Sequence, residues 1–218
     1  YTASRTRAER DTFHRDTDGL PFGCCQHDLI IKLDRWSLTH AVSTISERAV
    51  AGEEIRLFVT QSYITLLTEG QTAWLNNLLK AYGVREDSLV IEIKHADVLL
   101  NQKSIEDICQ SLGADGVQFC LNRYNPRNDE PDLLGSLPIK YVRLDNQLTA
   151  KISSQDARDR VKLLVDNAHR RGIQVIGNRV EDAQSAAALW MSGIDFIQGN
   201  LVQSADSSLE FGFDQSVL

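Results

Sequence analysis

Polar side chains follow most of the short apolar runs in this sequence, at positions where a strand would end. Nine of them are of types that take part in chemistry: Thr60, Glu92, His95, Asn122, Arg123, Arg143, Asp145, Asn178 and Gln198. Only Glu92 and Asp145 among them are acidic. Magnesium prefers several hard oxygen ligands, and a pair of metal ions needs bridging carboxylates. This set of residues therefore disfavours metal-dependent hydrolysis.

His95 stands three residues after Glu92, and such a pair could serve acid–base chemistry or bind a metal. A lone histidine is more often hydrogen bonded within the fold. Glu92 and Asp145 could likewise cap strand ends and tie loops. Both the chemical and the structural interpretation stay open at the level of the sequence.

The elements that position these side chains are helices that end near a glycine, each followed by a short segment rich in strand-forming residues. Glycine suits such a closing turn because it adopts the left-handed conformation without steric cost. Four such units place helices at 75–82, 105–112, 158–171 and 183–192, closing at Gly83, Gly113, Gly172 and Gly193, and strands at 89–93, 117–121, 173–176 and 194–197. Further strands are predicted at 55–59 and 141–144, and a helix at about 36–51.

This alternation predicts an α/β fold with mostly parallel strands, either a (β/α) barrel or an open doubly wound sheet. No Gly-x-Gly-x-x-Gly or Gly-x-x-x-x-Gly-Lys motif is present, which disfavours nucleotide binding by a glycine loop and favours the barrel. In a barrel the carboxyl ends of the strands converge on one mouth, where function is expected. The polar segment 122–131 is predicted to be a long loop after a strand.

The composition is that of a globular protein of 218 residues, with 42% hydrophobic residues and a net charge of −7. No nucleic-acid partner is expected, because duplex binding rests on clustered cations. No membrane insertion is expected, since no apolar run approaches the roughly 20 residues needed. The four cysteines show no disulfide or zinc spacing and are expected to be reduced thiols. The chain begins at Tyr1 without a signal peptide, which suggests one domain over 1–218, cut from a longer cytoplasmic protein.

Six segments together resemble the EAL domain of bacterial cyclic di-GMP signalling. They are 33–36, 59–62, 89–93, 137–145, 175–181 and 193–199, in the family's order and with plausible spacing. Active members of that family hydrolyse the dinucleotide with two divalent metals in a modified TIM barrel. The resemblance covers essentially the whole chain and implies a modified TIM (β/α) barrel of the EAL type.

The resemblance also implies that most of the family's metal and catalytic positions are replaced here. Thr2, Thr60, His95, Asn122, Arg123, Arg143 and Asn178 stand at replaced positions, whereas Glu92, Asp145 and Gln198 are kept. A guanidinium at Arg123 or Arg143 would repel a divalent ion, and Asn178 cannot accept a proton as a carboxylate does. We therefore expect no metal, no cofactor and no catalytic residue.

Binding of cyclic di-GMP without cleavage is a separate question. In the family, the first strand supplies an arginine to the ligand, and here that position falls on Thr6, with Arg5 and Arg7 beside it. A one-residue slip or a bulge could restore an arginine. The candidate ligand-binding residues are Arg5, Asp34, Arg123, Arg143 and Gln198.

Three functions follow, of which the leading one is a catalytically inactive EAL-like module that regulates through a protein partner or through self-association. The helix 156–171 could pair two barrels, with Arg158, Arg160, Lys162 and Asp166 outward. The alternative is a metal-independent cyclic di-GMP receptor that controls type IV pili or motility through a PilZ-type adaptor. The degenerate FimX-type pilus regulators suggest it, and the strand-like tail 207–215 resembles theirs. Residual phosphodiesterase activity is the third and least favoured function.

Overall fold

The computed structural model describes residues 24–202 of the chain. These residues form two compact units. The amino-terminal unit contains residues 24–120 and 136–138, and the carboxy-terminal unit contains residues 121–135 and 139–202. Thr2, Arg5 and the predicted strand 207–215 lie outside the described residues. The organisation of 1–218 as one domain stays a prediction.

Six strands form one sheet in which each strand neighbours the next one along the chain. They are β1 (Leu57–Thr60), β2 (Leu89–Lys94), β3 (Gln118–Tyr124), β4 (Tyr141–Leu144), β5 (Gln174–Gly177) and β6 (Phe196–Ile197). The pairs β1–β2, β4–β5 and β5–β6 are parallel. All six strands were predicted, and the parallel pairing in these three pairs is confirmed.

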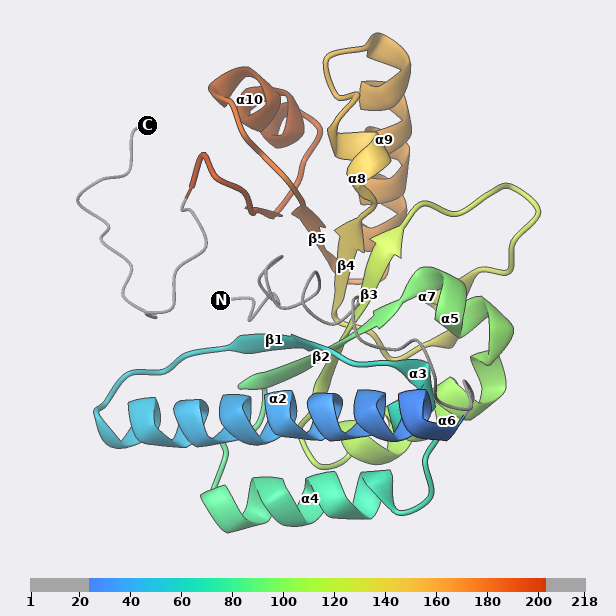
Figure 1. The fold of residues 1–218 in the computed structure, drawn as a ribbon. Helices are drawn as coiled ribbons and strands as arrows, with labels where there is room; N and C mark the ends of the chain where they lie inside the picture. Colours follow the sequence, from blue (N-terminus) through green and yellow to red (C-terminus); the bar gives the residue numbers. More distant parts are fainter. Residues whose placement is uncertain (1–23, 203–218) are drawn as a thin grey trace. The chain divides into compact units, whose positions relative to one another are not determined.

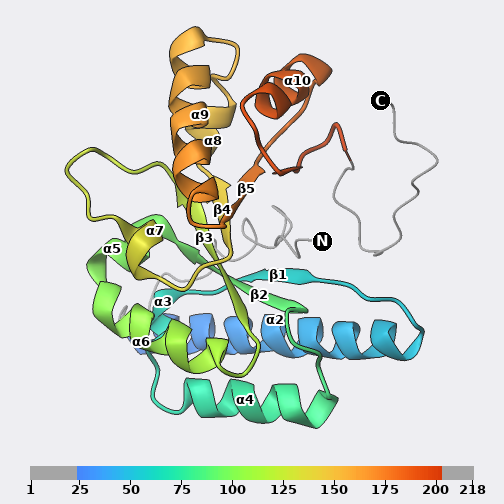
Figure 2. The same ribbon diagram turned by 180° about the vertical axis from the view of Figure 1, so that it is seen from behind.

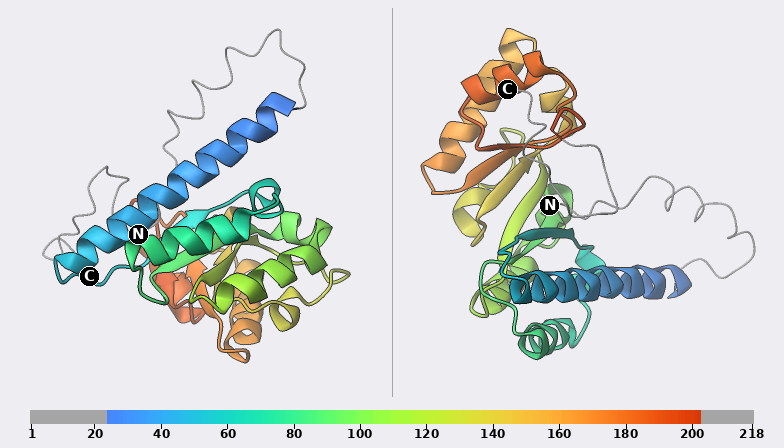
Figure 3. Two further views of the ribbon diagram at one scale, coloured as in Figure 1. Left: turned by 90° about the horizontal axis from the view of Figure 1, so that it is seen from below. Right: turned by 90° about the vertical axis from the view of Figure 1, so that its left-hand side faces the viewer.

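In the amino-terminal unit, the long helix α2 (Cys24–Val50) lies along β1 and β2, and α4 (Gln71–Tyr82) packs against it (Figures 1 and 3). Leu38, Ala41, Val42 and Ile45 are buried and recur at helical spacing, so that one stripe of α2 faces the core. The other helices of this unit are α3 (Tyr63–Leu66), α5 (His95–Leu100) and α6 (Gln102–Gly113). Strand β2 is buried from Leu89 to Ile93, as expected for a parallel strand covered on both faces.

In the carboxy-terminal unit, α9 (Gln155–His169) packs against β5 (Figure 2). Val161, Leu164, Val165 and Ala168 form its buried face. The helix α8 (Asn146–Thr149) precedes it, α10 (Ala183–Met191) follows β5, and α7 spans Leu133–Ser136. The side chain of Leu189 in α10 covers Gly177, where an added methyl group would come within 3.2 Å of it.

Several element boundaries differ from prediction. Helix α2 begins twelve residues before the predicted start at Trp36, since no proline or glycine interrupts residues 24–36. Gly113 stays helical, and Gly116 takes the left-handed conformation instead, with φ 84°. Strand β3 continues to Tyr124, so that the polar loop begins at Asn125 and not at Asn122.

Two of the tryptophans lie at the surface of the fold and not in its core. Trp36 is 63% exposed and Trp190 is 47% exposed, although both lie on helices among apolar residues. Trp74 is half-buried, and the guanidinium of Arg35 lies 5.1 Å from its ring centre. Helical spacing alone does not separate a buried stripe from a neighbouring exposed one.

The thiols of Cys109 and Cys120 are free and buried, which confirms the prediction for these two cysteines. Burial, together with the nearby Glu106, raises the pKa of Cys109 to about 12. Between residues 24 and 202, no helix is both long enough and apolar enough to span a bilayer.

Candidate functional site

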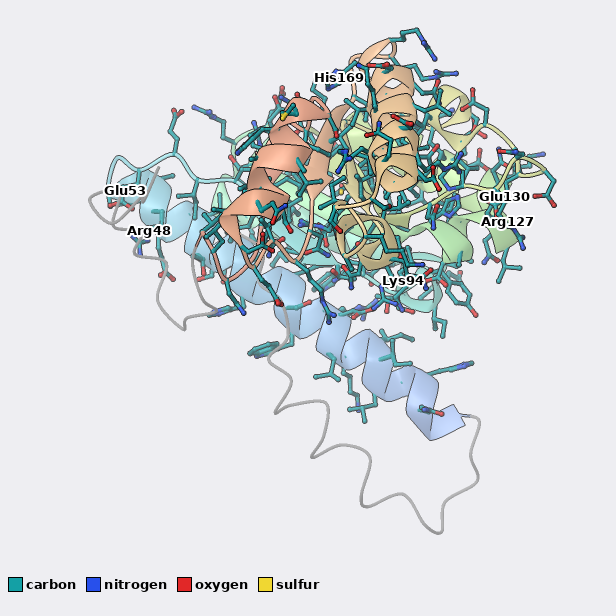
Figure 4. The ribbon with its side chains drawn as sticks, turned by 90° about the horizontal axis from the view of Figure 1, so that it is seen from above. Arg48, Glu53, Lys94, Arg127, Glu130 and His169 are labelled. Atoms are coloured by element: carbon teal, nitrogen blue, oxygen red, sulfur yellow. The ribbon has the colours of Figure 1, made fainter. Side chains whose placement is uncertain are left out.

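In the amino-terminal unit, the candidate residues Thr60 and Glu92 lie opposite one another at the carboxyl ends of β1 and β2. The hydroxyl of Thr60 donates a hydrogen bond of 3.0 Å to Glu92 Oε2. Glu92 is only 3% exposed, although proteins seldom bury a charged side chain. Lys94, the last residue of β2, is exposed and is labelled in Figure 4.

His95 follows directly as the first residue of α5 and is buried. Its ring is therefore enclosed by protein, which suits the structural interpretation of this histidine. The sequence correctly placed it close after the end of a strand. Its role in chemistry stays untested.

Asp34, a predicted ligand-binding residue, is buried on α2. One of its carboxylate oxygens accepts hydrogen bonds from the backbone N–H of Ser62, at 2.9 Å, and from the hydroxyl of Thr65, at 2.6 Å. Ser62 is the N-cap of α3. Asp34 thus fixes the segment that follows β1, because charge-assisted hydrogen bonds to a buried carboxylate are strong.

In the carboxy-terminal unit, Arg143 is buried at the end of β4 and donates a hydrogen bond to the side-chain oxygen of Gln198. The backbone oxygen of Gln198 in turn accepts from the N–H of Val180, at 3.0 Å. Gly199 permits this approach, since an added methyl group there would lie 2.1 Å from the Val180 oxygen. The chain after β5 and the chain after β6 are therefore held together beside Arg143.

The polar residues after β3, β4 and β5 are also linked within this unit. The backbone N–H of Asp145 donates to the Tyr124 oxygen at 3.0 Å, and the Asp145 carboxylate caps α8 by accepting from the N–H of Gln147 at 2.9 Å. The amide of Asn178 donates to the side-chain oxygen of Asn146 at 2.8 Å. Asp145 thus caps a helix, whereas the structural interpretation expected it to cap a strand end, and Asn122 lies half-buried in β3.

Two exposed arginines of this unit have left-handed backbone conformations, Arg123 with φ 57° and Arg179 with φ 56°. Such a conformation costs about 1–2 kcal/mol for a residue other than glycine. Within residues 24–202, neither arginine side chain forms a hydrogen bond or an ion pair. Arg123 lies at the end of β3 and Arg179 follows β5. Arg179 was not among the predicted site residues, although its place two residues after β5 was a signal that could have found it.

Within residues 24–202, no three histidine, cysteine, aspartate or glutamate side chains are close enough together to hold a metal ion. The acidic candidates lie on separate parts of the chain, with Glu92 in β2 and Asp145 capping α8. The candidate residues of the amino-terminal unit include the buried carboxylate of Glu92, and those of the carboxy-terminal unit include Arg123, Arg143 and the capping carboxylate of Asp145.

Comparisons with known proteins agree with this architecture. A curated relative is an uncharacterized 76.5 kDa protein from Thiocystis violacea, 27% identical over 190 residues, which are 85% of this chain and 26% of the relative. Another is the cyclic di-GMP phosphodiesterase PdeR of Escherichia coli, 24% identical over 174 residues, which are 79% of this chain and 26% of PdeR. The chain spans about a quarter of the length of these relatives.

Two solved structures share the fold. The EAL domain of FimX from Xanthomonas citri, in complex with c-diGMP, has a TM-score of 0.82 and 23% identity over 86% of this chain and 75% of that one. The FimX EAL domain from Pseudomonas aeruginosa, bound to c-di-GMP, has a TM-score of 0.80 and 24% identity over 86% of this chain and 76% of that one. This likeness confirms the predicted α/β fold of the modified TIM barrel type. The family model of the EAL domain matches residues 24–205, and the chain therefore belongs to the EAL domain family.

Proposed function

We propose that this chain is a catalytically inactive EAL domain that regulates cyclic di-GMP signalling by binding a protein partner. The observation that carries the proposal is the guanidinium of Arg123 at the end of β3, where the family resemblance implies an aspartate. Arg143, buried at the end of β4 in the same unit, stands where the resemblance implies a lysine and so keeps a positive charge.

The physical reason is electrostatic. A divalent ion and a guanidinium 4 Å apart repel each other by about 8 kcal/mol at an effective dielectric constant of 20. An arginine cannot escape this repulsion by losing its proton, because its pKa lies above 12. The amide of Asn178 cannot take a proton from an attacking water. These residues favour a site that neither gathers divalent metals nor activates water.

The test is a calorimetric titration of the chain with cyclic di-GMP, with and without magnesium, followed by chromatography of the nucleotides. We expect no hydrolysis product and no heat that depends on magnesium. Formation of the linear dinucleotide at a rate proportional to protein concentration would overturn the proposal. That result would instead support residual phosphodiesterase activity, the activity named for PdeR.

A second candidate function is a metal-independent cyclic di-GMP receptor that acts on type IV pili or motility through a PilZ-type adaptor. The fold shared with two FimX EAL domains solved with the dinucleotide favours it. The exposed guanidinium of Arg123 could contact a phosphate of the ligand directly.

The same calorimetric titration distinguishes the two candidate functions. Micromolar binding without magnesium, weakened about tenfold by Arg123→Ala, would support the receptor, because one charge-assisted contact contributes about 1.4 kcal/mol. The exposed Lys103→Ala serves as the control and should leave binding unchanged. The absence of any binding heat would support the module that acts through a protein partner alone.

A further inference from the structure

A groove lies in the carboxy-terminal unit between the polar loop after β3 and the helix α9. Its volume is about 250 Å3. Tyr124, Pro126 and Arg127 line it from the strand end and the loop. The guanidinium of Arg160 in α9 donates a hydrogen bond to the backbone oxygen of Pro126, which fixes the loop against the helix. We name this feature the cationic groove.

One face of α9 forms the other wall. The lining residues of this wall lie on a single stripe of the helix, because they follow Arg160 at intervals of three, four, seven and ten positions. They are Arg160, Leu163, Leu164, Asn167 and Arg170. Ten helical residues rise about 15 Å. An extended peptide covers this distance with about five residues. The groove therefore matches a short linear segment in length.

The charge of the groove is positive. Arg127, Arg160 and Arg170 line it, and no acidic residue does. Arg127 is neutralised by Glu130 at 2.9 Å, and the two lie together on the loop in Figure 4. Among the described residues, Arg160 and Arg170 form no ion pair. These two charges stand out on a chain whose net charge is −7, and they favour an anionic partner.

The groove also offers apolar contact. Leu163 is 57% exposed at its edge, while Leu164 and Tyr124 are buried beneath. Burial, together with the nearby carboxylate of Asp132, raises the pKa of Tyr124 to about 12. The phenol therefore stays neutral at physiological pH and adds no negative charge to the groove.

We propose that the cationic groove binds an acidic peptide segment of about five residues with an aliphatic side chain near its centre. The acidic side chains would pair with Arg160 and Arg170, and the aliphatic one would cover Leu163. The proposal rests on the proposed function, because it names the chemistry of the protein partner.

The test uses the 218-residue chain and a fluorescein-labelled peptide, Glu-Glu-Leu-Glu-Glu, with binding measured by fluorescence polarisation. We expect saturable binding that weakens about tenfold for the neutral peptide Gln-Gln-Leu-Gln-Gln. Arg170→Ala and Leu163→Ser should each weaken binding about fivefold, the effect of one partly exposed contact. Lys162→Ala, on the same helix but outside the groove, is the matched control and should change binding less than twofold.

Thermal unfolding of each variant shows whether a loss of binding reflects a loss of folding. No saturable binding, equal binding of the neutral peptide, or unchanged binding by a folded Arg170→Ala would overturn the proposal. The proposal would also be overturned if inorganic phosphate displaced the labelled peptide as effectively as the unlabelled peptide does, because the apolar contact would then contribute nothing. Self-association of the chain that Arg170→Glu abolishes would assign the groove to a second copy instead. Hydrolysis of cyclic di-GMP would overturn the proposed function and leave the peptide result intact.

Discussion

The charged side chains buried in the two units have opposite signs. In the amino-terminal unit the buried charged side chains are the carboxylates of Asp34 and Glu92. In the carboxy-terminal unit the buried charge is the guanidinium of Arg143, with Arg123 and Arg179 exposed on neighbouring strand ends. One scaffold of strands and helices can therefore bury carboxylates in one part and a guanidinium in another.

The two units also differ in what their charges do. Asp34 accepts two hydrogen bonds from the segment after β1, so it stabilises the fold around it. The side chains of Arg123 and Arg179 contribute no hydrogen bond or ion pair within the described residues. We therefore expect substitutions of the buried charges to lower stability and substitutions of these exposed arginines to leave it nearly unchanged.

The largest effect is expected for Arg143→Ala. Truncation removes the donor to Gln198 and opens a cavity at the end of β4, and the loss of a buried charged partner typically costs several kcal/mol. We expect the free energy of unfolding to fall by about 3 kcal/mol, measured by urea denaturation.

The control for this variant is Arg179→Ala, an exposed arginine of the same unit. It should change the free energy of unfolding by less than about 0.5 kcal/mol. If the two variants lose the same free energy of unfolding, the buried Arg143 contributes no more to stability than the exposed Arg179.

Asp34→Ala tests the amino-terminal unit in the same way. The backbone N–H of Ser62 and the hydroxyl of Thr65 would lose their acceptor, so we expect a loss of about 2 kcal/mol in urea denaturation. Asp28→Ala, at an exposed position of the same helix, is the matched control and should have little effect. If both aspartates behave alike, Asp34 does not fix the segment after β1.

A smaller loss is expected for Thr60→Val, which removes the hydroxyl that donates to Glu92 but keeps a side chain of similar shape. Thr60 is exposed, so we expect the free energy of unfolding to fall by only about 1 kcal/mol. Thr60→Ser retains the hydroxyl and should lie closer to the unsubstituted chain. The reverse order of the two variants would contradict a role for this hydrogen bond.

The smallest effect is expected at Asp182, the exposed N-cap of α10. Hydrogen bonds from the backbone N–H and the hydroxyl of Ser185 hold the pKa of Asp182 below its usual range. A carboxyl group whose pKa falls on folding stabilises the fold above the pKa of the unfolded chain, and this stabilisation is lost as the pH falls through the folded value.

Asp182→Ala should therefore lower the melting temperature at pH 7, and the difference from the unsubstituted chain should shrink at pH values below the ordinary aspartate range. Asp182→Asn keeps a capping oxygen and should lose less than Asp182→Ala at pH 7. A difference that grows as the solution is acidified would contradict this sign.

The sequence predicted the elements of this fold well, because the buried strands are short, apolar and preceded by helices that end near glycine. Gly83 and Gly172 adopt the left-handed conformation as expected. Element ends were less predictable. Strand β3 extends through Asn122 to Tyr124, with Arg123 in the left-handed conformation, and polar residue types alone do not reveal this extension.

The site was predictable as a set of strand ends but not as a set of contacts. Glu92, Arg143 and Asp145 lie where expected, at or directly after strands. That Arg143 is buried and donates to Gln198 depends on two segments 55 residues apart in the chain, which no local pattern encodes. The groove beside α9 was equally invisible, since its loop and helix meet only in three dimensions.

The single hydrogen atom that serves as the side chain of Gly199 has an architectural consequence. A methyl group there would act as a wedge against the Val180 carbonyl and drive apart the chain segments leaving β5 and β6. The amide that meets Arg143 would move with them. One added carbon atom at Gly199 could therefore break the hydrogen bond between Arg143 and Gln198 although neither of these residues is changed.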